Sequence, residues 1–240
     1  MGVQTKMINE TRNGKNIGYF TSVFLGLFTV FLMIALILIL GGRINYWQGW
    51  AFGVITVLLV LVKSIFFPSR SDLIEERIRP GPGIKWWDNL FYAFYIPAFF
   101  AVFIIGSLDG GRFGWTASLP IFVYISGYIM YIFSISIFLW AQQINRFFST
   151  VVRIQHDRGH VVIQTGPYKY VRHPGYIGGI VMAISTALVL GSLWALMPAG
   201  VVVILLIIRT YLEDTTLQKE LPGYADYAKK VRHRLLPGVW

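Results

Sequence analysis

The stretch PGYIGGIVMAISTALVLGSLWALMPAGVVVILLII, residues 174 to 208, runs for 35 residues without a charged side chain. As one helix rising about 1.5 Å per residue it would be about 50 Å long, whereas the hydrocarbon core of a membrane is about 30 Å thick. We therefore expect a hairpin of two membrane-spanning helices. Because glycine commonly ends a helix, we place the turn at Gly191-Ser192, near the middle of the stretch.

The composition of the whole chain is typical of a membrane protein. Of its 240 residues, 55% are hydrophobic and 13% are charged, whereas soluble domains carry roughly 25% charged residues. The apolar stretches predict six spans, at about residues 17–41, 46–67, 89–108, 119–142, 174–190 and 193–212. The sequence therefore predicts an all-α fold, a polytopic transmembrane helical bundle that includes a C-terminal helical hairpin.

The basic residues are distributed unequally between the two sides of this bundle. Of the 21 Lys and Arg residues, 18 fall in the N-terminus, the second and fourth loops and the C-terminal tail, while the opposite side holds Arg43 and Arg112. Because basic loops tend to stay in the cytoplasm, this asymmetry predicts that both termini are cytoplasmic. It also accounts for the net charge of +10 without a nucleic-acid partner, since basic loops suit an anionic inner leaflet.

The polar residues divide the chain into two regions. Residues 1–142 consist mainly of four spans and their loops, whereas residues 143–240 hold the hairpin, an amphipathic tail and the unusual polar side chains. These side chains gather in three patches, at residues 145–176, 209–217 and 221–238. All three map to the predicted cytoplasmic face, so we expect the function to reside there.

The conspicuous residues of these patches also have structural interpretations. Arg209 can extend from a span end to lipid headgroups, and His173 can cap a helix that starts at the following proline. The tyrosines of residues 166–176 can belong to an interfacial aromatic belt. The combination nevertheless favours a binding site, because Arg209 and Glu213 are four residues apart and would share one face of a helix.

Several kinds of site are excluded. The absence of cysteine excludes a disulfide framework, a thiol nucleophile and a thiolate metal site. The chain has no H-E-x-x-H, G-x-S-x-G or Walker-type motif, so we expect no metal site, Ser-His-Asp hydrolase or phosphate-binding loop. The polar groups instead suit a polar cofactor bound beside a lipid-facing opening.

Three ordered motifs identify a family resemblance. They are H-V-V-I-x-T-G-P-Y-x-Y-V-R-H-P-G-Y at 160–176, R-x-x-x-E-D at 209–214 and G-Y-x-x-Y-x-x-x-V-x-x-R-L-x-P at 223–237. This pattern resembles the isoprenylcysteine carboxyl methyltransferases and, more widely, the integral-membrane phospholipid methyltransferases. The resemblance covers roughly residues 143–240 and implies a catalytic region that binds S-adenosyl-L-methionine (SAM) on the cytoplasmic side. It implies a multi-pass membrane enzyme whose acceptor is a lipidic or prenylated small molecule.

The resemblance also implies roles for individual residues. Arg209 and Glu213 are candidate catalytic residues, with Arg209 on the substrate side and Glu213 matching a family acid that contacts the cofactor. Arg153 stands where the prenylcysteine enzymes often have glutamine. We expect tyrosine rings to contact the cofactor and the loop amides before the helix at Pro174 to bind its carboxylate. The candidate cofactor-binding residues are Arg153, His160, Val161, Val162, Ile163, Tyr168, His173, Pro174, Gly175, Tyr176 and Glu213.

The implied reaction is an in-line displacement at the methyl carbon, for which the protein aligns two substrates and excludes water. A carboxylate acceptor needs no base at neutral pH, and Arg209 can hold it bidentately. For an amine acceptor, Glu213 or Asp214 would accept the proton. Carboxylate esterification, amine N-methylation of a phospholipid and methylation of a small isoprenoid or thiol all remain open.

Two other classes of protein remain open. Membrane sterol reductases also carry R-H-P-x-Y and bind a reduced nicotinamide cofactor, but they typically read R-H-P-N-Y-x-G-E where this chain has Gly175 and Gly179. A lipid-binding or scaffolding protein with a degenerate pocket is the non-enzymatic alternative. The intact set of His173, Tyr176, Arg209 and Glu213 argues against it. The sequence does not indicate an oligomeric state.

Overall fold

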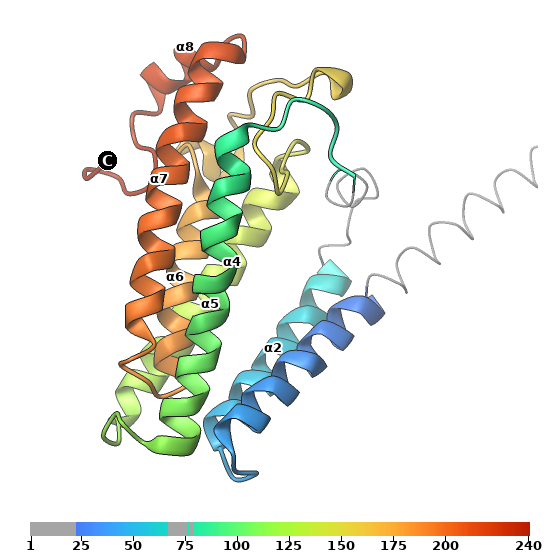
Figure 1. Ribbon diagram of the computed structural model, residues 1–240. Helices are drawn as coiled ribbons and strands as arrows, with labels where there is room; N and C mark the ends of the chain where they lie inside the picture. The colour runs from blue at the N-terminus through green and yellow to red at the C-terminus, as the bar shows by residue number, and fades with distance from the viewer. Residues whose placement is uncertain (1–22, 67–75, 77–78) are drawn as a thin grey trace, which may run out of the picture.

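The computed structural model describes residues 23–66, 76 and 79–240, which form an all-helical bundle (Figure 1). The described residues contain no β-strand, and the predicted fold class is confirmed. The long helices are a first helix Val23–Gly41, α2 Trp47–Phe66, α4 Trp86–Ser107, α5 Ile121–Ile144, α6 Pro174–Val189 and α7 Leu196–Glu220. Shorter elements are the π-helix η1 Leu108–Phe113, the 3₁₀ turns η2 His156–Arg158 and η3 Gly166–Lys169, and α8 Tyr224–Lys230.

The six predicted spans correspond to these six long helices. Five of them are long and apolar enough to cross a membrane, and α6, with 16 residues, is the shorter one. The start of the first predicted span, residues 17–22, lies outside the described residues. Helix α7 continues eight residues past the predicted end at 212. It can do so because Asp214, in this extension, finds its partners on other elements rather than in lipid.

The predicted hairpin turn joins α6 to α7. Gly191 has a φ of +78°, and the chain ends α6 with hydrogen bonds from the N–H of Leu190 to the Thr186 carbonyl and from Ser192 to Ala187. A β-carbon on Gly191 would lie 2.9 Å from the Tyr124 hydroxyl oxygen. Both the left-handed backbone and the close approach require glycine here, so the predicted turn position is confirmed.

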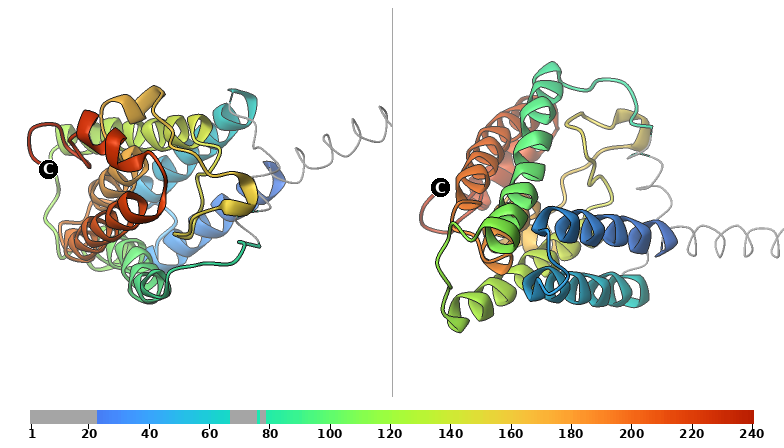
Figure 2. Two further views of the ribbon diagram at one scale, coloured as in Figure 1. Left: turned by 90° about the horizontal axis from the view of Figure 1, so that it is seen from above. Right: turned by 60° about the horizontal axis from the view of Figure 1, so that its bottom comes forward.

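Helices α4, α5, α6 and α7 form one bundle, and the first helix and α2 form a hairpin beside its lower part (Figures 1 and 2). Small side chains of α6 and α7, among them Ala183, Ala187 and Ala199, pack against Phe91 and Val102 of α4. Such small residues let helix backbones approach closely, which is how helices associate in a membrane. The bundle thereby fixes α4 and α7 side by side, and both contribute to the site.

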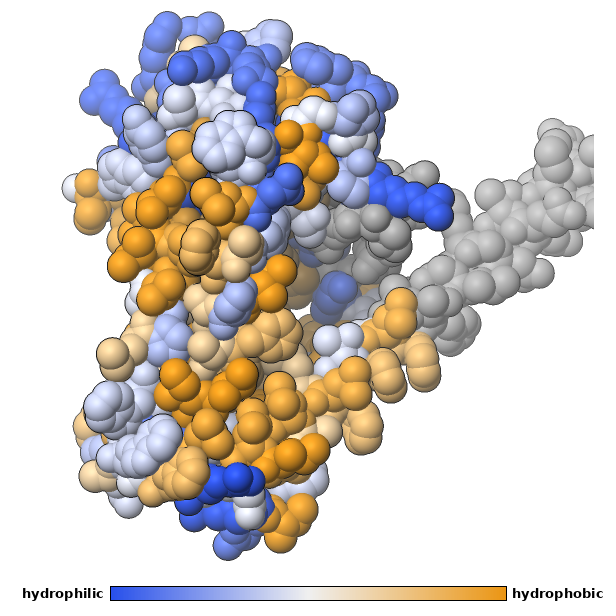
Figure 3. All heavy atoms as spheres, viewed as in Figure 1, coloured by the Kyte–Doolittle hydropathy of each residue, from blue (hydrophilic) through white to orange (hydrophobic). Residues whose placement is uncertain are grey.

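The polar loops gather at one end of the molecule. The segment before α4, the loop between α5 and α6, and α8 lie at the top in Figure 1. Figure 3 shows a hydrophilic surface there, an apolar band below it and a smaller hydrophilic area at the opposite end. The prediction that the three polar patches share one face is therefore confirmed. Its cytoplasmic orientation, and the division of the chain at residue 142, stay predictions.

Candidate active site

A cavity of about 380 Å³ lies at the polar end of the bundle. Its walls come from α4, α5, the loop 145–163, the start of α6, α7 and α8. This size falls in the range of about 300–1,000 Å³ that is usual for small-molecule sites. Part of the wall is polar and part is apolar, so the cavity suits a ligand, or a pair of ligands, with a polar part and an apolar part.

The cavity brings together nearly all residues that the sequence proposed. Eleven of the twelve candidates line it, namely Arg153, His160, Val161, Val162, Ile163, Tyr168, His173, Gly175, Tyr176, Arg209 and Glu213. The exception is Pro174, which is buried at the first position of α6 and does not line the cavity. Its role is therefore to begin the helix, since its ring fixes the backbone angle that a first helical residue needs.

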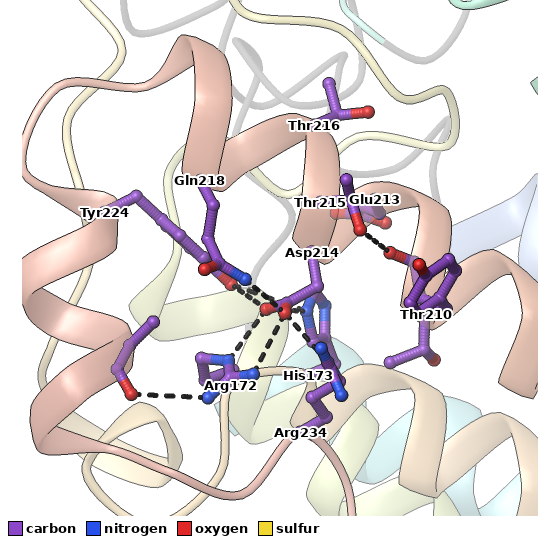
Figure 4. Close-up of polar contacts among 12 residues, drawn as sticks. Arg172, His173, Thr210, Glu213, Asp214, Thr215, Thr216, Gln218, Tyr224 and Arg234 are labelled. Carbon is purple, nitrogen blue, oxygen red and sulfur yellow. Dashed lines mark hydrogen bonds and ion pairs between the residues drawn. The ribbon is translucent and has the colours of Figure 1, made fainter.

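Asp214 is the centre of a buried network that holds the R-H-P motif against α7 (Figure 4). Its side chain is fully buried, and its two oxygens accept hydrogen bonds from Arg172 at 2.7 and 2.9 Å. Arg234 of the C-terminal tail donates to the same carboxylate at 2.8 Å, and the Tyr224 hydroxyl donates at 3.0 Å. The Nε2 of His173 lies 3.3 Å from it. With these partners Asp214 is a structural anchor, and the interpretation of it as a proton acceptor is wrong.

The C-terminal tail occupies the loop amides that precede α6. The N–H of Arg172 donates to the carbonyl of His233 at 2.9 Å, and the N–H of His173 donates to the carbonyl of Arg234 at 3.0 Å. The sequence predicts that these amides bind a cofactor carboxylate. That prediction is wrong for both residues, because the tail has satisfied their donors.

Arg209 is held by α4 and by the loop after α5. Its side chain is 7% exposed, and its Nη2 lies 2.9 Å from the Oδ1 of Asp88. The Nη1 donates to the Tyr92 hydroxyl at 3.2 Å and the Nη2 to the carbonyl of Thr150 at 2.5 Å. The guanidinium carbon lies 5.6 Å from the centre of the Tyr176 ring. Arg209 therefore turns into the protein, and the interpretation of an arginine extending to lipid headgroups is wrong.

Glu213 lies one turn after Arg209 on α7 and also lines the cavity, as their spacing predicted. Its carboxylate accepts a short hydrogen bond from the Tyr176 hydroxyl. The Tyr176 ring in turn stacks on the His173 ring, with 5.7 Å between their centres. The acid, the two rings and the arginine therefore form one continuous surface.

Arg153 is fixed from outside the cavity by two acids. It forms ion pairs with Glu76 at 2.7 Å, where both side chains are buried, and with Asp157 at 2.7 Å. The nearby Gln155 also lines the cavity and is 1% exposed. Its Nε2 donates to the Phe147 carbonyl at 2.8 Å. A buried glutamine thus lies two residues after Arg153, the position at which the prenylcysteine enzymes often have one.

His160 and the extended segment after it form another wall. Burial, with Arg153 nearby, lowers the pKa of His160 to about 4, so its imidazole is neutral at pH 7. Its Nδ1 accepts the N–H of Gln155 at 3.3 Å, and its ring lies 4.5 Å from that of Phe147. Across the part of the chain that the structure describes, no group pairs with the N–H groups of residues 161–163. These amides are available to a ligand.

The contribution of α4 was missed by the sequence analysis. Tyr92 and Tyr95 line the cavity, and Asp88 holds Arg209. A signal was present, because residues 88, 92 and 95 are spaced to share one helical face. An acid at the edge of a membrane span is also a recognised mark of function.

Comparison with known proteins agrees with these motifs. Residues 125–219 match the sequence model of the isoprenylcysteine carboxyl methyltransferase (ICMT) family. The protein-S-isoprenylcysteine O-methyltransferase of Schizosaccharomyces pombe is 36% identical over 50 residues, or 21% of each chain. That of Saccharomyces cerevisiae is 33% identical over 91 residues, 35% of this chain and 36% of the relative. A probable protein-S-isoprenylcysteine O-methyltransferase of Oryza sativa subsp. japonica is 30% identical over 101 residues, 39% of this chain and 50% of the relative.

The matched stretches thus span half or less of the length of these relatives. Residues 125–219 include the loop 145–163, the R-H-P loop, α6 and the Arg-Glu face of α7, which together supply most of the lining of the cavity. Residues 125–219 of the chain therefore match the isoprenylcysteine carboxyl methyltransferase family, the family that the motifs resemble.

Proposed function

We propose that the protein is a SAM-dependent membrane methyltransferase that esterifies the carboxylate of a prenylated cysteine at the cytoplasmic face. The observation that carries this proposal is that one cavity is lined both by the segment 160–176 and by Arg209 and Glu213 of α7. The matched relatives are named as O-methyltransferases of isoprenylcysteine, which supports the same chemistry here.

The polar part of the cavity fits SAM. This cofactor has an adenine, an amino acid group and a positively charged sulfur, so it needs backbone hydrogen-bonding groups, aromatic faces and a negative charge. The amides of residues 161–163 supply the backbone hydrogen-bonding groups. The rings of Tyr168 and Tyr176 supply the aromatic faces, and Glu213 supplies the negative charge. Neutral His160 adds a ring nitrogen for hydrogen bonding. When bound, SAM supplies a methyl group activated by the positive sulfur.

Three further candidates would complete the cofactor side. Arg153 and His173 present their side chains to the cavity while ion pairs and hydrogen bonds hold them from behind. Gly175 leaves room for the Phe148 ring, because a β-carbon there would lie 2.8 Å from it. These residues would therefore shape the cofactor side through fixed positions.

The other part of the cavity suits a lipidic acceptor. Its apolar wall comes from four helices and consists of Tyr95, Phe138, Met182 and Leu206. Along α7, Arg209 stands between Leu206 on the apolar side and Glu213 on the polar side. The buried Nε of Arg209 has no hydrogen-bond partner among the described residues. A donor is thus left for the headgroup of an acceptor whose tail lies against the apolar wall.

A carboxylate is the acceptor that these groups serve best. Arg209 would bind and orient it, and such positioning is worth about 7–11 kcal/mol of a reaction barrier. A carboxylate is already ionised at neutral pH, so no proton acceptor is needed. For an amine acceptor Glu213 is the remaining base, because Asp214 is fully occupied by Arg172 and Arg234.

Two measurements test the proposal. Titration of the detergent-solubilised protein with SAM should show saturable binding, and an excess of NADPH should leave that binding unchanged. Incubation with methyl-labelled SAM and an N-acetylated farnesylcysteine should then give a labelled methyl ester that mild base releases as methanol. Absence of SAM binding contradicts the cofactor assignment. A base-stable label on phosphatidylethanolamine, with none on the prenylcysteine, would instead identify an amine N-methyltransferase.

A further inference from the structure

Asp88 is a buried carboxylate that no motif of the sequence includes. It lies in the first turn of α4, is 0% exposed and precedes the residues 125–219 that match the family. Its Oδ2 accepts the N–H of Val152 at 2.8 Å, and its Oδ1 lies 2.9 Å from the Nη2 of Arg209. It therefore joins α4 to α7 and to the loop after α5.

Aromatic rings surround Arg209 but do not fix the orientation of its guanidinium group. The guanidinium carbon lies 4.4 Å from the centre of the Phe91 ring and 4.9 Å from that of Tyr92. Attraction to a ring face tolerates rotation of the guanidinium, whereas a charge-assisted hydrogen bond requires a defined direction. Asp88 supplies the charged partner that sets this direction, and the carbonyl of Thr150 and the hydroxyl of Tyr92 add neutral hydrogen bonds.

We propose that Asp88 is the positioning residue of Arg209, and that its carboxylate holds the guanidinium in the orientation that receives the headgroup of the acceptor. This inference rests on the proposed function, because it takes Arg209 as the residue that binds the acceptor. Asp88 also balances the charge of the arginine. Recognition of the acceptor then depends on where the remaining donors of Arg209 point, including the unpaired Nε.

The substitution Asp88→Asn tests this role. Asparagine keeps the size of the side chain and an oxygen for the Val152 N–H, but it removes the charge that faces Arg209. We expect kcat/KM for the prenylcysteine to fall about 100-fold, the effect of displacing a positioning group by about 1 Å. SAM affinity should change by less than about threefold, because only the acceptor side is disturbed. Asp88→Glu restores the charge and should recover part of the activity.

A matched control and a double-mutant cycle separate positioning from a merely structural role. Asp226 is an exposed acid that does not line the cavity, and Asp226→Asn should leave kcat/KM unchanged. Acceptor affinity, measured by titration with the farnesylcysteine, should fall for Asp88→Asn in the normal chain. It should fall much less in an Arg209→Lys background, because the group that Asp88 positions has been replaced.

The outcomes distinguish this inference from the proposed function. If the unsubstituted protein methylates no prenylcysteine, the proposed function fails. If it is active and Asp88→Asn is equally active, the inference about Asp88 fails alone. Equal losses of acceptor affinity in both backgrounds would also overturn it, as would a loss of SAM affinity as large as the loss of turnover.

Discussion

Replacement of Asp214 by asparagine should destabilise the protein and weaken SAM binding together. The substitution keeps the shape of the side chain but removes the charge that Arg172 and Arg234 share. The Arg234 side chain is 23% exposed and can turn to water, whereas that of Arg172 is 5% exposed and stays buried. Breaking one buried ion pair costs about 3–5 kcal/mol, and we assign this loss to Arg172.

For a chain of this length, such a loss lowers the unfolding temperature by roughly 2–4 °C per kcal/mol, or about 6–20 °C in total. Tryptophan fluorescence of the protein in detergent would follow the thermal unfolding. Asp226→Asn removes a carboxylate from an exposed pair with Lys229 and should leave the unfolding temperature unchanged. If Asp214→Asn behaves like this control, the network does not anchor the R-H-P loop and our reasoning is refuted.

Three further predictions concern single groups of the cavity. Arg209→Ala should abolish methyl transfer and largely spare SAM binding, whereas His173→Ala should weaken SAM binding first; equal losses in titration and turnover would show that the roles are misplaced. Gly175→Ala should cost about 1–3 kcal/mol of stability, because its β-carbon would lie 2.8 Å from the Phe148 ring; an unchanged melting curve would show that the ring moves freely. His160 has a pKa lowered by burial to about 4 from 6.5, so the unfolded chain gains a proton at a higher pH than the folded protein. The stability of the normal protein relative to His160→Gln should therefore fall as the pH drops from 6.5 to 4, and a constant difference between their unfolding temperatures would contradict this.

The fold could be predicted because the membrane imposes a simple rule on sequence. Helix length, apolar content and one glycine placed the six helices and the turn at Gly191 within a few residues, except at the end of α7. That end was misplaced because the rule assumes that acids lie in water. Asp214 instead lies in a protein interior, where Arg172 replaces water as its partner. A pairing between residues 42 positions apart cannot be read from local hydropathy.

The residues of the site that belong to a sequence motif could be predicted. The residues from distant segments that hold them in place could not. The candidate residues of 160–176 and 209–213 line one cavity, apart from Pro174. The supports of these residues lie elsewhere. Asp88 holds Arg209 and Glu76 holds Arg153, and both acids precede the motifs by more than 60 residues. The hydrogen bonds between the tail carbonyls and the loop amides could not be predicted either, because backbone groups are the same in every residue and produce no side-chain pattern.

The ion pairs of the arginines and the occupied loop amides also bear on the choice between SAM and a nicotinamide cofactor. Among the described residues, the arginines on the cofactor side of the cavity are each paired with a buried acid: Arg153 with Glu76 and Arg172 with Asp214. A nicotinamide dinucleotide carries phosphates, which proteins bind with unpaired cations or with free amides at a helix N-terminus. Here the arginines are neutralised and the amides of Arg172 and His173 are occupied. SAM has no phosphate, so its binding does not need unpaired arginines. Its positively charged sulfur would be attracted to the Glu213 carboxylate. The pairing of these arginines with buried acids therefore favours a cationic cofactor over a dinucleotide.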